Sequence, residues 1–178
     1  MMNQEERRQF VRDHSYCIWG YNRREHGPAM TPGYYTVEGE DICYFTMRAR
    51  AKARVARRDR RASVCILDGQ QPPSYLQVFG QVRIDEDREF VYNVFMKTVR
   101  TEMTGEGNTF SQQEADEKRA ETMEWLESED RIVLRLTPES TFYSPPTRGS
   151  TLEEKYEYRR SLGEVKAGTV RIGQAMPW

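Results

Sequence analysis

Residues 75–84, YLQVFGQVRI, show the clearest period in the sequence, because small or aliphatic residues alternate with polar or aromatic ones. The first set consists of Leu76, Val78, Gly80, Val82 and Ile84. Since successive side chains of a strand point to opposite faces, this period of two predicts a strand with one face in the core. The predicted fold is built outward from this strand.

Shorter apolar or alternating runs on both sides of it predict further strands. These are residues 16–21, 29–37, 42–46, 62–67 and 131–137. Turn sequences follow several of them, such as EGED at residues 38–41 and DG at residues 68–69. A doubly wound parallel sheet would instead need a helix between most strands. We therefore expect a mainly β fold with peripheral helices, in the form of a small antiparallel barrel.

Capping signals indicate where the peripheral helices begin. Asn3 with Glu6 three residues later, and Ser111 with Glu114, are the pairs of a capping box. Further helices are expected after the cap residue Asp85, at the alanine-rich residues 48–58 and at residues 151–162.

The composition fits one globular domain without metal or disulfides. The chain has 178 residues, a formal net charge of −1 and a pI near 6.2, which excludes a general attraction to nucleic acid or acidic membranes. Its three cysteines are Cys17, Cys43 and Cys65, they form no CxxC pair, and only two histidines are present. We expect buried thiols and no metal site.

The N-terminus is charged where a signal peptide needs an apolar stretch, and no apolar run approaches the roughly 18 residues of a membrane span. The sequence therefore predicts a cytoplasmic protein with no membrane or nucleic-acid partner.

Charge is unevenly distributed along the chain. Residues 48–61 contain eight Lys or Arg and one acid, whereas residues 102–130 contain ten acids and two bases. The basic segment follows a strand and enters a predicted helix, where side-chain donors, backbone N–H groups and the helix dipole combine to bind anions. This pattern predicts an anion site. A merely solubilising helix and a nucleic-acid contact are the alternatives, and no second basic element supports the latter.

Four segments, in this order, carry a family resemblance. They are residues 26–35 with Thr31-Pro32-Gly33, residues 44–64 with Tyr44-Phe45-Thr46 and the basic segment, residues 75–80 and residues 132–138. Together they resemble the pyridoxamine-phosphate-oxidase-like family of flavin-binding split β-barrels, in particular its flavin/deazaflavin oxidoreductase branch. The resemblance implies an FMN-binding type split β-barrel over residues 1–143, followed by a C-terminal extension at residues 144–178.

The resemblance also implies the residues of a cofactor site. Thr31, Pro32 and Gly33 match the strand whose backbone runs beside the ring. Phe45 and Thr46 match the strand end that lines it. Arg50 and Lys52 match the positions that hold the cofactor phosphate. Arg48 and Arg57 add positive charge for a longer anionic tail. The sequence departs from the family pattern at Trp19 and Val55.

Family members use FMN or the deazaflavin coenzyme F420, and the surplus of positive charge favours F420. The implied function is hydride transfer to an unsaturated small molecule, by a homodimer with the cofactor at the subunit interface. An FMN-dependent oxidoreductase of the same fold, or a non-catalytic flavin- or haem-binding protein, is the alternative. No catalytic residue is assigned.

Overall fold

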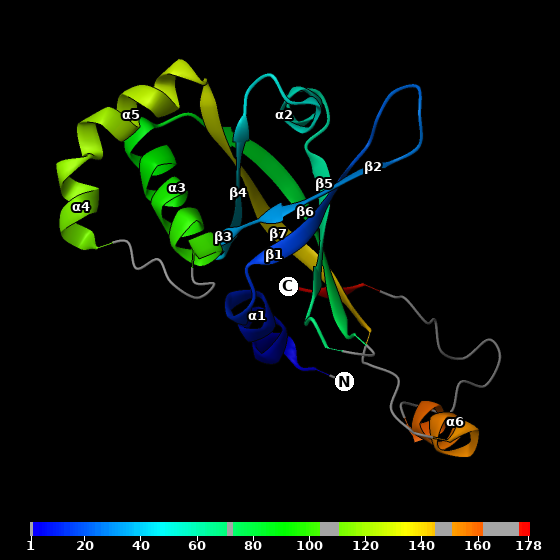
Figure 1. The fold of residues 1–178 in the computed structure, drawn as a ribbon. Coiled ribbons are helices and arrows are strands. Elements are labelled where there is room, and N and C mark those ends of the chain that lie inside the picture. The colour runs from blue at the N-terminus through cyan, green and yellow to red at the C-terminus, as the bar shows by residue number, and fades with distance from the viewer. Residues whose placement is uncertain (1, 71–72, 104–110, 145–150, 162–174) are drawn as a thin grey trace.

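The structure, a computed structural model, describes residues 2–70, 73–103, 111–144, 151–161 and 175–178. Its centre is a curled, wholly antiparallel sheet, with helices at its periphery (Figure 1). The strands are β1 (Tyr16–Tyr21), β2 (Ala29–Tyr34), β3 (Thr36–Glu38), β4 (Asp41–Met47), β5 (Arg61–Leu67), β6 (Tyr75–Asp85), β7 (Arg131–Ser144) and β8 (Met176–Pro177). The expected mainly β split barrel is confirmed.

The strand order is β2-β1-β5-β6-β7-β4-β3, and β8 pairs with β7. The inward residues of β6 are those that the period of two predicted, with Leu76 and Val78 fully buried. They pack with Val64 and Ile66 of β5 into the main core, which closes under α1 (Gln4–Asp13). Alternation along the sequence therefore determines which face of this sheet lies inside.

The other helices are α2 (Ala51–Ala56), α3 (Arg88–Met103), α4 (Gln112–Glu117), α5 (Arg119–Ser128) and α6 (Leu152–Ser161). Figure 1 shows α3, α4 and α5 together on one side of the sheet. Val91 and Val94 of α3 pack against Cys43 of β4 and Val133 of β7, so this part of the sheet is covered on its outer face as well. No helix of the described ranges is long and apolar enough to cross a membrane.

Both predicted capping boxes are present, because Asn3 and Ser111 each accept a hydrogen bond from the glutamate N–H three residues on. The helix expected after Asp85 is capped differently. Asp87 accepts the hydrogen bond from the Phe90 N–H, at 2.8 Å, and Asp85 instead accepts one from the Asp87 N–H. The prediction for Asp85 was wrong by two residues, because β6 runs to Asp85, which is still paired with Val133 of β7, so the helix begins later.

The last strand is longer than the predicted residues 131–137, because it continues past Pro138. The register of β6 and β7 shifts between Phe79 and Gly80, and Gly80 lies opposite Pro138. A β-bulge accommodates a proline that the ladder would otherwise exclude. The second half of β7 then pairs with β8, and Arg7 donates a hydrogen bond to the Pro177 carbonyl at 2.7 Å.

The sheet does not close between β2 and β4, and we call this opening the seam. A hydrogen bond spans it, from the Tyr44 hydroxyl to the Pro32 carbonyl at 3.0 Å. The absence of a side chain at Gly33 permits this approach, since a Cβ there would lie 2.2 Å from the Tyr44 hydroxyl oxygen. Figure 1 shows α2 at one end of the sheet and α6 at the other.

The bulge gives a first prediction. Gly80→Ala should lower the free energy of unfolding by about 2–3 kcal/mol, because its Cβ would lie 2.1 Å from the Thr137 carbonyl oxygen and backbone cannot give way. Gly20→Ala is the matched control, since its Cβ would meet the Ser63 hydroxyl at 2.8 Å and that side chain can rotate. Urea unfolding of both variants measures the difference. Equal stability of the two variants would contradict the role assigned to the bulge.

Candidate functional site

A pocket of about 420 Å³ lies at the seam. β1 and β2 contribute one residue each, the end of β4 contributes four, and the start of α2 and of β7 complete the wall. The lining residues are Tyr21, Thr31, Tyr44, Phe45, Thr46, Met47, Arg50, Ala51, Lys52 and Arg131. The volume falls in the usual range for small-molecule sites. We call it the seam pocket.

The fold brings five of the nine predicted site residues to this pocket: Thr31, Phe45, Thr46, Arg50 and Lys52. Pro32 and Gly33 lie directly behind it. The Pro32 carbonyl accepts the Tyr44 hydroxyl bond, and the Gly33 backbone lies against the Tyr44 ring.

The remaining two predicted residues lie elsewhere. Arg48 is ion-paired with Asp130, at 2.7 Å, and with Glu86, and lines a separate pocket under α5. Arg57 is the C-cap residue of α2, is exposed and lines none of the pockets found in the described ranges. Two positions of the basic segment thus face away from the seam.

The helix in the basic segment is shorter than residues 48–58, because it spans only Ala51–Ala56. Its buried residues are Ala53, Val55 and Ala56, so these side chains anchor it on the core. Such a short helix adds little dipole, and the anion affinity of the seam pocket rests on the side chains of Arg50 and Lys52.

Lys52 is half-buried and has no anionic partner in the described part of the chain. Its Nζ lies 4.8 Å from the centroid of the Tyr44 ring, a cation–π contact. Burial, followed by repulsion from Arg50, lowers the pKa of Lys52. Among the described residues, no carboxylate lies within 4 Å of either cation. An anion bound here would stabilise the charged form of Lys52.

Thr31 leaves a second unsatisfied group at the seam. Its Oγ1 is buried without a hydrogen bond of good geometry to any described residue. The neighbouring Tyr44 hydroxyl is committed to Pro32. Burial raises the pKa of Tyr44 to about 12, and the proximity of Thr31 only partly offsets this. Tyr44 is therefore a neutral donor, and Thr31 has hydrogen-bonding capacity to spare for a ligand.

Two departures from the family pattern, Trp19 and Val55, lie outside the pocket lining. Trp19 is buried in the main core, with its ring centroid 5.2 Å from that of Tyr44. Trp19 packs against Tyr44 on the core side, and it does not line the seam pocket. Val55 faces the core from α2.

Sequence reasoning missed Arg131, which the fold brings to the seam pocket from the start of β7. It lies about 80 positions from the basic segment and directly after an acidic one. Its partner in the β4–β7 ladder, Met47, would have identified it, but only once the strand register was known.

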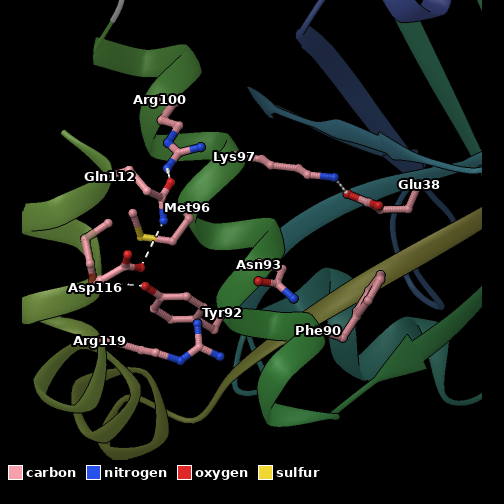
Figure 2. A pocket seen from close by; sticks show the side chains of 11 residues that line it. Glu38, Phe90, Tyr92, Asn93, Met96, Lys97, Arg100, Gln112, Asp116 and Arg119 are labelled. Carbon is pink, nitrogen blue, oxygen red and sulfur yellow. Dashed lines mark hydrogen bonds and ion pairs between the residues drawn. The ribbon is translucent and has the colours of Figure 1, made fainter. Parts of the chain in front are cut away.

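Another pocket, of about 280 Å³, lies between α3 and α4 (Figure 2). Its charged groups largely satisfy one another: Lys97 pairs with Glu38, and Gln112 bridges Arg100 and Asp116. None of the predicted site residues lines it. Among the described residues, no three His, Cys, Asp or Glu side chains gather as metal ligands would.

Comparisons with known proteins identify the family and the fold. The family model described as pyridoxamine 5'-phosphate oxidase matches residues 4–144. No curated protein matches.

Solved structures share the fold. The conserved hypothetical protein Rv2991 from Mycobacterium tuberculosis has a TM-score of 0.65 at 20% identity, covering 86% of this chain and 95% of that one. A FAD-binding protein from Mesorhizobium loti has a TM-score of 0.57 at 14% identity, covering 79% and 92%. A protein described as F420 reductase has a TM-score of 0.50 at 18% identity, covering 71% and 88%.

The family model covers most of the chain, including both sides of the seam and the whole of the pocket lining. The chain therefore belongs to the pyridoxamine 5'-phosphate oxidase family.

Proposed function

We propose that this protein is an oxidoreductase that binds the deazaflavin coenzyme F420 in the seam pocket and reduces an unsaturated small molecule. FMN is the alternative cofactor. The single observation that carries the proposal is the meeting of Arg50 and Lys52, both without a carboxylate partner in the described chain, with the spare hydroxyl of Thr31 in one pocket. A phosphate and a polar ring edge are the groups that this set would satisfy.

The pocket residues fit such a cofactor in separate ways. Arg50 and Lys52 would hold the phosphate, since no carboxylate of the described residues pairs with either of them. Thr31 and Thr46 would bond to the ring edge, and Pro32 and Gly33 would support the ring indirectly by positioning Tyr44. When bound in its reduced form, the deazaflavin supplies a hydride to an activated double bond.

The protein's own part in the reaction is positioning and control of protons. No residue that lines the seam pocket is an acid or a histidine. Tyr44 keeps its proton on the Pro32 carbonyl. The proton that completes the reduction of the double bond would then come from water or from a lining donor such as Lys52 or Tyr21.

A second group of basic side chains supports F420 over FMN. A shallow pocket of about 200 Å³ on the other side of Ala51 contains four arginines and one histidine against a single acid. Its charged residues are Arg23, Arg24, Glu25, His26, Arg54 and Arg58. Ala51 lines both pockets, so the anionic tail of a longer cofactor would continue from one into the other. The fold is shared both with the F420 reductase and with the FAD-binding protein, so the choice rests on these basic side chains.

We further propose a homodimer with the seam pocket at the interface between subunits. The outer face of β2, β1, β5 and β6 exposes apolar side chains, with 71% of Met30, 47% of Tyr16 and 37% of Leu67 accessible. Cross-strand pairing places Tyr16 beside Tyr34, and Leu67 beside Tyr75. Exposed apolar side chains, interspersed here with polar ones such as Ser63 and Gln77, favour association.

Cofactor choice is tested by thermal-shift titration of the apoprotein with F420, FMN and haem. A ligand at about a hundred times its dissociation constant adds about 2.7 kcal/mol of stability. For a chain of this size, this raises the melting temperature by about 5–10 °C. We expect this rise with F420. A rise with FMN alone would support the cofactor site but identify FMN as its cofactor. No rise in melting temperature with any of the three ligands would contradict the proposal.

The phosphate contacts are tested by Lys52→Met and Arg50→Ala. Each should weaken F420 binding by at least about tenfold, since a charged hydrogen bond contributes about 1.5–3 kcal/mol. Arg57→Ala removes the same charge from the exposed end of α2 and should leave the affinity unchanged. Fluorescence titration measures all three dissociation constants. A uniform loss across the three variants would indicate nonspecific attraction rather than a built phosphate site.

The dimer is tested by Met30→Glu and Leu67→Glu. Both side chains are accessible in the single chain, so the variants should fold normally while the dimer weakens by at least about tenfold. Leu152→Glu on α6, where 69% of the side chain is accessible, is the matched control and should leave association unchanged. Sedimentation velocity gives the dimer fraction. A wild-type protein that stays monomeric over the whole concentration range would contradict this part of the proposal.

A further inference from the structure

Arg131 is held more firmly than the other cations of the seam pocket. Its guanidinium carbon lies 5.0 Å from the ring centroid of Phe45 and 5.3 Å from that of Trp125. Its Nε donates to a Glu129 carboxylate oxygen at 2.8 Å, and Nη2 donates to the same oxygen. Only 22% of the side chain is accessible. Two rings and one carboxylate thus fix the plane of this guanidinium before any ligand arrives.

The hydrogen bonds of Arg131 leave part of the group unused. A guanidinium has five N–H donors, and Glu129 accepts from two of them. No described residue accepts a hydrogen bond from Nη1, and Arg131 lines both the seam pocket and the pocket under α5. A planar group oriented in this way matches a carboxylate, which can accept two parallel N–H bonds.

Arg131 enters the pocket from another element than Thr31, Arg50 and Lys52, and it lies beside Phe45 of β4. Thr31 belongs to β2 and Arg131 to β7, and β4 lies between these two strands. Arg50 and Lys52 are at the start of α2. A phosphate held by that pair leaves Arg131 available to a second molecule. Met47 and Phe45 line the pocket beside it and offer apolar surface.

We infer that Arg131 binds the carboxylate of the substrate, and that the substrate class is a small unsaturated carboxylic acid with an apolar body. This inference rests on the proposed reductase function, because it assigns a substrate group to the same pocket. Pairing with Arg131 withdraws charge from the carboxylate and thereby favours hydride addition to the adjoining double bond.

The experiment compares trans-cinnamate with cinnamamide, its neutral counterpart of nearly the same shape. Calorimetric titrations use the wild-type chain, with and without F420, and the variants Arg131→Gln, Arg131→Lys and Arg88→Gln. Arg88→Gln is the matched control, because Arg88 pairs with Glu127 in the adjacent pocket and does not line the seam pocket. We expect the wild type and Arg88→Gln to bind cinnamate at least about tenfold more tightly than cinnamamide. The reason is that the neutral amide cannot form the charged hydrogen bond that the carboxylate forms with Arg131.

Arg131→Gln should abolish this preference while F420 binding, measured in the same samples by thermal shift, stays at the wild-type level. Arg131→Lys should keep part of the preference, since it retains the charge without the paired donors, and it serves as the test should Arg131→Gln fail to fold.

Equal binding of the two probes by the wild type, no binding of cinnamate, or a preference that survives in both Arg131 variants would overturn the inference. A preference for cinnamate that depends on Arg131 in a protein that binds no cofactor would support this inference and reject the proposed function. F420 binding without a preference for cinnamate would support the proposed function and reject this inference.

Discussion

The feature on which the site depends is the failure of the sheet to close between β2 and β4. A ladder there would satisfy the backbone of both strands and fill the space with side chains. Instead a hydrogen bond, from Tyr44 to the Pro32 carbonyl, spans the gap. Gly33 permits it, because any side chain at that position would displace the Tyr44 ring. Trp19 supports the ring from the core. The seam is thus an opening with rigid walls.

Position, rather than charge alone, determines which cations of the basic segment reach the seam pocket. Arg48 and Arg61 both belong to the basic segment, but each is neutralised by a nearby carboxylate. Arg50 and Lys52 lie two and four residues beyond Arg48 and have no such partner among the described residues. Leaving a half-buried lysine without a counter-ion costs stability, which is why such a group suggests a ligand.

Much of the fold followed from the sequence, because strands and helix starts leave local patterns. The alternation at residues 75–84 gave both the strand and its buried face, and Asn3 and Ser111 gave two helix starts. The errors lie where two local signals compete. Asp85 and Asp87 are both good caps, and Pro138 is a normal strand breaker that the bulge at Gly80 accommodates. Only pairing with a distant strand decides such cases.

The sequence by itself determined the fold class, the family and most of one wall of the pocket. That wall consists of consecutive residues at the end of β4 and the start of α2, and local order along the chain places them. The tertiary structure decided which cations face the pocket and which pair with acids. It also brought in Arg131 and set Thr31 across the seam. These relations depend on strand register between segments many residues apart, which no local pattern records.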